Sequence, residues 1–127
     1  MREELDKKLV EKYPKIFAQR FDDMRTTAMC WGFDCDDGWY WILDSLCNSV
    51  QNYIDNNKIP QVTATQVKEK YGGLNFYYTG GDSMTDGMVW LAESMSYRTC
   101  ETCGSTNNVT QTEGWIYTRC EKCIKQK

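Results

Sequence analysis

Four of the seven cysteines in this chain lie in its last quarter, as two pairs with the same spacing. Cys100 and Cys103 form one C-x-x-C motif, Cys120 and Cys123 form another, and 16 residues separate the two motifs. Two residues between cysteines allow a tight turn to point both thiolates at one ion, and Gly104 suits the left-handed position of such a turn. The pattern therefore predicts one zinc ion held by four thiolates. Four protein ligands leave no open position for water or substrate, so we expect a structural zinc.

Three other interpretations of the motifs are two local disulfides, a redox-active C-x-x-C pair and a rubredoxin-type iron site. An odd number of cysteines argues against a complete disulfide framework. The charged N-terminus MREELDKKLV does not have the pattern of a signal peptide, and no stretch approaches the roughly 18 apolar residues of a membrane span. We therefore expect a cytoplasmic protein with reduced thiols. Two short strands around Glu113 and Gly114 are predicted between the motifs, as in a zinc ribbon.

The rest of the chain has the composition of a folded domain, with 41% hydrophobic residues and 17 aromatic side chains. Leu5, Leu9 and Tyr13 recur at helical spacing before Pro14, which predicts a first helix. A second helix of some 18 residues is predicted from about Gly38, with Asp36 or Asp37 as its N-cap. Its apolar face comprises Ile42, Leu43, Leu46, Cys47, Val50 and Ile54.

After Pro60 the pattern changes to alternating β-branched and aromatic residues, with Gly72 and Gly73 between two runs. This predicts a β-hairpin with a glycine turn. Ser83 and Asp86 then resemble a capping box at the start of a third helix. We expect the apolar stripe of that helix to be core, and it comprises Met84, Met88, Leu91, Ala92 and Met95.

These elements predict an α+β fold: a small helical domain with a β-hairpin and a C-terminal zinc ribbon packed on it. Residues 1–97 form the domain, with two helices, the hairpin and the third helix. Residues 98–127 form the ribbon. Because the third helix runs almost directly into Cys100, we expect the two parts to make one compact unit.

A second metal site is a weaker prediction. Asp34, Asp36 and Asp37 precede a glycine as in a calcium loop, but the glycine and glutamate that such a loop requires are missing at the correct spacing. We interpret this run as a helix cap with a solvated acidic face. The other three cysteines, Cys30, Cys35 and Cys47, could form a second metal site together with an Asp, but we expect them to be buried or idle thiols.

Charge argues against generic nucleic-acid binding. Residues 1–97 carry ten basic and fifteen acidic side chains, and residues 98–127 carry five basic and three acidic ones. Four thiolates on a divalent ion add two negative charges, so the ribbon with its metal is near neutral. Nucleic-acid-binding proteins usually present a basic face, because counterion release supplies much of their affinity. Binding through the ribbon remains an alternative, not the favoured one.

Five stretches together resemble a family of small bacteriophage proteins that end in a zinc ribbon. They are YPKIF, DDGWYWILDSLC, QVKEKYGGLNFYY, CETCG and the GW that precedes the last C-x-x-C. The resemblance covers nearly the whole chain, and the KEKYGG turn is its most recognisable piece. Asn75 departs from the arginine of similar proteins, which weakens a phosphate-binding role at that position. The family has no established activity, so the resemblance implies a phage accessory protein in the cytoplasm of an infected bacterium.

Catalytic motifs are missing from the sequence. Without histidine, Ser/His/Asp and Cys/His mechanisms are excluded, and neither glycine pair has the spacing of a phosphate-binding loop or a dinucleotide fingerprint. Carboxylate chemistry remains open, but no spacing singles out a residue among Asp34, Asp36, Asp37, Glu69 and Glu93. We therefore expect a binding protein and not an enzyme.

Two kinds of partner are expected ahead of nucleic acid. The favoured one is a host protein, either a defence or a housekeeping protein, that this protein inhibits or redirects. Its candidate aromatic anchors are Trp39, Tyr40, Trp41 and Trp90. The alternative is counter-defence by sequestration of a small anionic nucleotide signal. Cations and aromatic faces for that ligand are offered by Lys68, Lys70, Tyr71, Tyr77 and Arg98.

Overall fold

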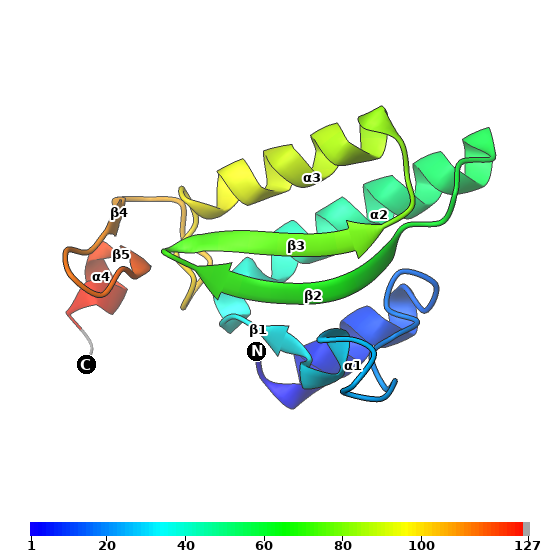
Figure 1. Cartoon of the computed structure of the whole chain (residues 1–127). Coiled ribbons are helices and arrows are strands. Elements are labelled where there is room, and N and C mark those ends of the chain that lie inside the picture. Colours follow the sequence, from blue (N-terminus) through cyan, green and yellow to red (C-terminus); the bar gives the residue numbers. More distant parts are fainter. Residues whose placement is uncertain (126–127) are drawn as a thin grey trace.

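The computed structural model describes residues 1–125 and confirms the α+β class (Figure 1). Gln126 and Lys127, the last residues of the predicted ribbon, lie outside the described part. The main elements are α1 (Glu3–Lys12), α2 (Tyr40–Asn57), β2 (Thr63–Lys70), β3 (Gly73–Thr79) and α3 (Ser83–Ser96). Short elements are η1 (Met29–Trp31), β1 (Phe33–Asp34), η2 (Asp37–Trp39), β4 (Val109–Gln111), β5 (Thr118–Cys120) and α4 (Glu121–Ile124).

The main sheet has three strands in the order β1-β2-β3. The predicted hairpin accounts for β2 and β3, and β1 is an additional strand. β2 and β3 pair antiparallel, with a bulge between Ala64 and Gln66. β1 pairs with β2 in parallel through Phe33 opposite Val67, and α2 makes the connection between these two strands. The sequence did not predict β1, because two residues are too few to show alternation.

Helix α3 closes the outer edge of β3. The backbone N–H of Leu74 donates to Ser96 Oγ and that of Phe76 donates to Glu93 Oε2, both at 2.9 Å. These N–H groups point away from β2 and would otherwise face solvent, so the helix satisfies them with side chains. α3 is thereby fixed in its rotation as well as in its position.

The turn of the hairpin differs by one residue from the prediction. Its two residues are Tyr71 and Gly72, with φ of 53° and 87°, and Gly73 is already the first residue of β3. Positive φ at both central residues is typical of a type I′ turn, which matches the twist of the strands. Gly73 has a different reason to be glycine, because a Cβ there would collide with the hydroxyl of Tyr97.

The predicted length and apolar face of α2 are confirmed. The helix has 18 residues, and its buried residues include Ile42, Leu43, Leu46, Cys47, Val50 and Ile54. The predicted N-cap is wrong, since neither Asp36 nor Asp37 caps with its side chain, and η2 leads into the helix instead. Asp37 accepts a hydrogen bond from the backbone N–H of Arg2 at 2.8 Å, which ties it to the N-terminal segment.

The start and the rotation of α3 also differ from the prediction. Its capping box is formed by Asp82 and Thr85, one residue earlier than Ser83 and Asp86. The buried face comprises Thr85, Val89, Ala92 and Ser96. Of the predicted core stripe only Ala92 is buried, while Met84, Leu91 and Met95 are exposed and Met88 is partly buried.

One buried cluster joins the elements of the domain. It includes Leu9 of α1, Leu43 of α2, Val67 and Phe76 of the sheet, and Val89 of α3. Helices α2 and α3 run side by side in opposite directions (Figure 1). The segment that follows α3 returns to the start of α2, where Gly38 N–H donates to Glu101 O and Trp39 Nε1 donates to Thr99 O.

Candidate metal centre and apolar groove

The four predicted cysteine ligands converge on one point. The sulfur atoms of Cys100, Cys103, Cys120 and Cys123 all lie within 4.8 Å of one another, and those of Cys103 and Cys120 are 3.6 Å apart. Tetrahedral coordination with metal–sulfur bonds of about 2.3 Å puts sulfur atoms about 3.8 Å apart. All seven cysteines lie within residues 1–125 and are free thiols there. The cluster can therefore hold a metal ion.

The backbone around the first motif forms a tight turn. Gly104 N–H donates to Cys100 O at 2.9 Å, and Cys100 N–H donates to Ser105 O at 2.8 Å. Burial opposes ionisation of Cys100, but hydrogen bonds from the N–H groups of Cys120, Cys103 and Thr102 outweigh it and lower the thiol pKa to about 6. The thiolate is the form that binds metals, and these N–H groups favour it at Cys100, whereas burial raises the pKa of the Cys123 thiol to about 12.

Strands β4 and β5 supply the second motif. They pair antiparallel, with Val109 opposite Cys120 and Gln111 opposite Thr118, as predicted for strands around Glu113 and Gly114. Cys120 ends β5 and Cys123 follows in the single turn of α4. The residues from Arg98 to Lys125 are called the cysteine module below.

The first motif of the module packs against the start of α2. Gly38 N–H donates to Glu101 O at 2.7 Å, and Asp36 N–H donates to Glu101 Oε2 at 3.0 Å. A Cβ at Gly38 would collide with the carbonyl oxygens of Cys100 and Glu101. The glycine in DDGW is thus required by close approach of two backbones, and the module is built into the domain.

Two further contacts fix the module to the domain. Trp39 Nε1 donates to Thr99 O at 2.9 Å, at the junction between α3 and the module. At the hairpin turn, Thr118 Oγ1 donates to Gly72 O. The module therefore contacts both α2 and the hairpin, which agrees with the predicted packing of the ribbon on the domain.

The three cysteines outside the module do not join the ligand cluster. Cys47 is fully buried and Cys35 is 5% exposed, whereas Cys30 is partly exposed. Burial raises the pKa of the Cys35 thiol to about 12 and also raises that of Cys47. These two side chains act as small apolar core residues, as expected.

The candidate aromatic anchors separate into two groups. Trp39 is fully buried and Tyr40 is 4% exposed, so neither can anchor a partner, and this part of the prediction is wrong. Trp41 is 71% exposed and Trp90 is 72% exposed. The WYW run covers consecutive positions around the start of α2, so its members point in different directions and only Trp41 reaches solvent.

The candidate residues for an anionic ligand are only partly brought together. Lys68 and Lys70 share one face of β2, and the register places Tyr77 on that face opposite Gln66. Tyr71 in the turn is 75% exposed, with its ring centroid 5.8 Å from Lys70 Nζ. Arg98 is exposed in the turn between α3 and Cys100, so it comes from a different element.

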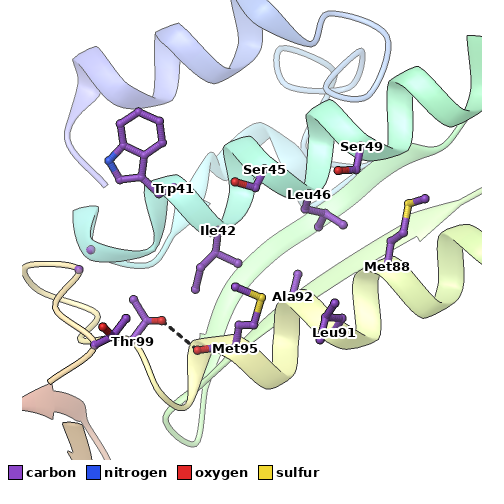
Figure 2. Close-up of a pocket in the computed structure, with 13 residues that line it drawn as sticks. Trp41, Ile42, Ser45, Leu46, Ser49, Met88, Leu91, Ala92, Met95 and Thr99 are labelled. Atoms are coloured by element: carbon purple, nitrogen blue, oxygen red, sulfur yellow. Dashed lines mark hydrogen bonds between the residues drawn. The ribbon is translucent and has the colours of Figure 1, made fainter. Parts of the chain in front are cut away.

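An apolar groove lies between α2 and α3 (Figure 2). The sequence did not predict it. The groove has a volume of about 340 Å³. From α2 come Trp41, Ile42, Ser45, Leu46 and Ser49; from α3 come Met88, Leu91, Ala92 and Met95; and one end is closed by Gly38, Thr99, Gly104 and Thr106. Three of the four residues at that end belong to the cysteine module, so the module forms a wall of the groove.

A signal for this groove does exist in the sequence. Met88, Leu91 and Met95 were expected in the core, yet Val89 and Ala92 occupy the core face of the same helix. The 14-residue helix α3 has apolar side chains on two neighbouring faces. Its contact with the core buries only one of these faces, so the other face stays at the surface. On α2, Ser45 and Ser49 are one turn apart and leave the space that the α3 side chains border.

Comparisons with protein-family models, with curated proteins and with solved structures returned no match. Among residues 1–125, no helix combines the length and the apolar character needed to cross a membrane. The cysteine cluster and the groove are therefore the features that bear on function.

Proposed function

We propose that this protein is a non-enzymatic binding protein whose apolar groove receives a segment of a partner protein. The observation that carries the proposal is the exposure of the groove wall: Trp41 is 71% exposed, Leu91 57% and Met95 47%. Contiguous apolar surface of this kind costs solvation free energy and is typical of interaction sites. Methionine side chains adapt to partners of different shape, which suits a binding groove.

In this proposal the cysteine module holds one structural zinc ion. Four thiolates match the preference of zinc for tetrahedral sulfur sites and fill its coordination shell. The ion would hold the turn of Cys100 to Gly104 in place, and that turn abuts Gly38 at the end of the groove. Zinc thus contributes shape to the binding site and no chemistry to it.

The resemblance to small phage proteins supports a partner from the bacterial host, bound in the host cytoplasm. The formal net charge of −3 favours a partner surface with positive charge. Inhibition or redirection of that partner would follow from occupation of its binding segment.

Affinity capture from bacterial lysate tests the proposal. The bait proteins are the wild type, a groove variant Leu91→Asn/Met95→Gln and a control Trp90→Gln. Trp90 is on α3 and as exposed as Trp41, but it does not line the groove, so this proposal gives it no role as a partner anchor. We expect a protein that is captured by the wild type and the control and is lost with the groove variant. Capture that is equal with all three baits would contradict the proposal.

Sequestration of an anionic nucleotide is the second candidate, because Lys68 and Lys70 project from the same face of β2. Two charge-assisted contacts are worth about 1.5–3 kcal/mol each, so a Lys68→Ala/Lys70→Ala variant should lose about a hundredfold or more in affinity. Calorimetric titration with cyclic nucleotides and ADP-ribose derivatives measures this. If the wild type binds none of them, this candidate is wrong.

A further inference from the structure

We propose that the groove takes one amphipathic helix of the partner, with its apolar side inward and basic residues along its flanks. This inference rests on the proposed function and specifies the partner segment. Three features of the groove carry it: its shape, the state of the nearby backbone hydrogen bonds, and the distribution of charge.

The groove has the shape of a seat for a helix. α2 and α3 are neighbouring antiparallel helices, and the groove lies between them (Figure 2). Ser45 and Ser49 make one wall low, whereas Leu91 and Met95 make the other wall long and flexible. A third helix can pack into such a depression with side chains at helical spacing, as in helix-in-groove recognition. A volume of about 340 Å³ accommodates a few leucine-sized side chains.

Hydrogen bonding favours a helix over an extended strand. A bound strand needs free backbone groups at a sheet edge, but the outward N–H groups of Leu74 and Phe76 are already bonded to Ser96 and Glu93. Polar groups in the groove itself come from serine and threonine side chains and backbone at its ends. An occupant must therefore satisfy its own backbone, and a helix does so internally.

Charge favours a basic occupant. The stretch from Phe33 to Asn57, which includes α2, has five Asp and no Lys or Arg. The stretch from Tyr71 to Tyr97, which includes α3, has three acidic side chains and no Lys or Arg. Asp44 pairs with Lys12, and among the described residues no acidic side chain lines the groove itself. The formal charge of both helices is nevertheless negative, because neither α2 nor α3 contains a Lys or Arg. Opposite charge on the flanks of a partner helix would steer its approach, and acidic flanks would be repelled.

Three peptide pools test the inference with the intact protein immobilised through one terminus. The first pool has 16-residue peptides with Leu, Ile, Met or Phe at helical spacing and Lys or Arg elsewhere. The second has the same apolar positions with Asp or Glu elsewhere, and the third has the composition of the first with strict alternation. Mass spectrometry measures which peptides are retained by the wild type, by Leu91→Asn/Met95→Gln and by Trp90→Gln.

We expect retention of first-pool peptides by the wild type and by Trp90→Gln, at least about tenfold above both other pools and above the groove variant. The groove variant keeps the net charge, so a loss there reports apolar contact and not electrostatics. Equal retention of the alternating or the acidic pool, retention that ignores the groove variant, or no retention at all would each overturn the inference.

Two outcomes separate this inference from the function on which it rests. If the groove variant abolishes capture of a lysate protein while the first pool is not retained, the protein-binding function stands and the helical basic partner is wrong. If light scattering shows that the wild type is a dimer and the groove variant a monomer, a second copy of this chain occupies the groove, which also overturns the inference.

Discussion

The domain and the cysteine module are each stabilised internally by a different kind of interaction. The domain has a continuous cluster of buried aliphatic and aromatic side chains from Leu9 to Ala92. The buried cluster of the module consists of Cys100, Cys120 and Cys123, with Val109 packed against it. A segment of this size cannot bury enough apolar surface to fold alone, so metals or disulfides usually stabilise such segments.

The difference shows which part of the protein depends on its surroundings. The domain buries its own core, and α3 satisfies the outer N–H groups of Leu74 and Phe76, so we expect it to fold without a ligand. The module has short strands and exposed aromatic residues, among them Trp115 at 78% exposure. Contacts with Gly38 and Gly72 fix it to the domain, and we propose that a metal ion on the four cysteines provides the rest of its order. Because it closes one end of the groove, the module connects the candidate metal site to the proposed binding site.

The largest expected effect is that of metal removal, which should affect the cysteine module and the domain differently. Chelation, or Cys103→Ser, should unfold residues 98–125 and leave the domain folded. The free energy that a structural zinc contributes to such modules is on the order of 10 kcal/mol. Amide hydrogen exchange measures both regions in one sample. Protection that stays high in the module after chelation would show that the metal does not hold it.

The next effect concerns the contact between the two regions. Gly38→Ala places a Cβ against the carbonyl oxygens of Cys100 and Glu101, so the module must shift. Overpacking of this kind costs about 1–3 kcal/mol, which denaturant titration with tryptophan fluorescence measures. We also expect weaker groove binding, because this contact closes the groove. Unchanged stability would mean that the two backbones do not approach as closely as described.

A smaller effect lies within the domain and depends on pH. Asp44 accepts hydrogen bonds from Lys12 Nζ and from Tyr13 OH, the latter at 2.7 Å. Burial opposes ionisation of Asp44, but these hydrogen bonds outweigh it and hold the carboxyl pKa below its ordinary value. A lowered pKa stabilises the fold above the unfolded value of about 4, and this contribution is lost as the pH falls through the folded value.

We therefore expect Asp44→Asn to cost about 1 kcal/mol at pH 7, since the pair is partly exposed. The difference from the wild type should shrink as the pH drops below about 4. Thermal unfolding at several pH values measures it. A cost that is the same at pH 7 and pH 3 would show that the ionised carboxylate is not the source.

The smallest effect is a gain of stability. Gly87 lies within α3 and a Cβ there would meet nothing within 4 Å. Gly87→Ala should stabilise the domain by about 0.5–1 kcal/mol, because alanine loses less backbone entropy in a helix. It is also the matched control for Gly38→Ala, since both add one methyl group to a glycine without positive φ. Destabilisation by Gly87→Ala would point to an unrecognised contact of α3.

The sequence predicts those features that depend on local spacing. The two C-x-x-C motifs identify their own ligand set, and the 3.6-residue period of α2 identifies its buried face except for Tyr40 in the first turn. The cap of α3 is less certain from sequence, because Asp82 with Thr85 and Ser83 with Asp86 both fit a capping box. Tertiary hydrogen bonds from Leu74 and Phe76 to the helix decide its rotation, and a sequence pattern does not contain them.

The groove was missed for the same reason. A predicted apolar stripe of α3 was assigned to the core, whereas Val89 and Ala92 fill that position and leave Leu91 and Met95 at the surface. Likewise, Trp39 and Trp41 are two residues apart in one run, and tertiary contacts decide which of them is buried: Trp39 joins the core cluster and donates to Thr99 O. Surplus apolar residues on a short helix thus indicate an exposed apolar groove as readily as a core.

Native mass spectrometry of protein purified without added metal shows whether the module holds a zinc ion. We expect the mass of the chain with one zinc ion bound at the four thiolates of Cys100, Cys103, Cys120 and Cys123, and loss of that ion in Cys103→Ser. A bound iron ion would contradict the choice of metal. A metal-free chain that has lost two hydrogen atoms for each disulfide, or one that is fully reduced with its module still protected from exchange, would contradict the account of how the module is held.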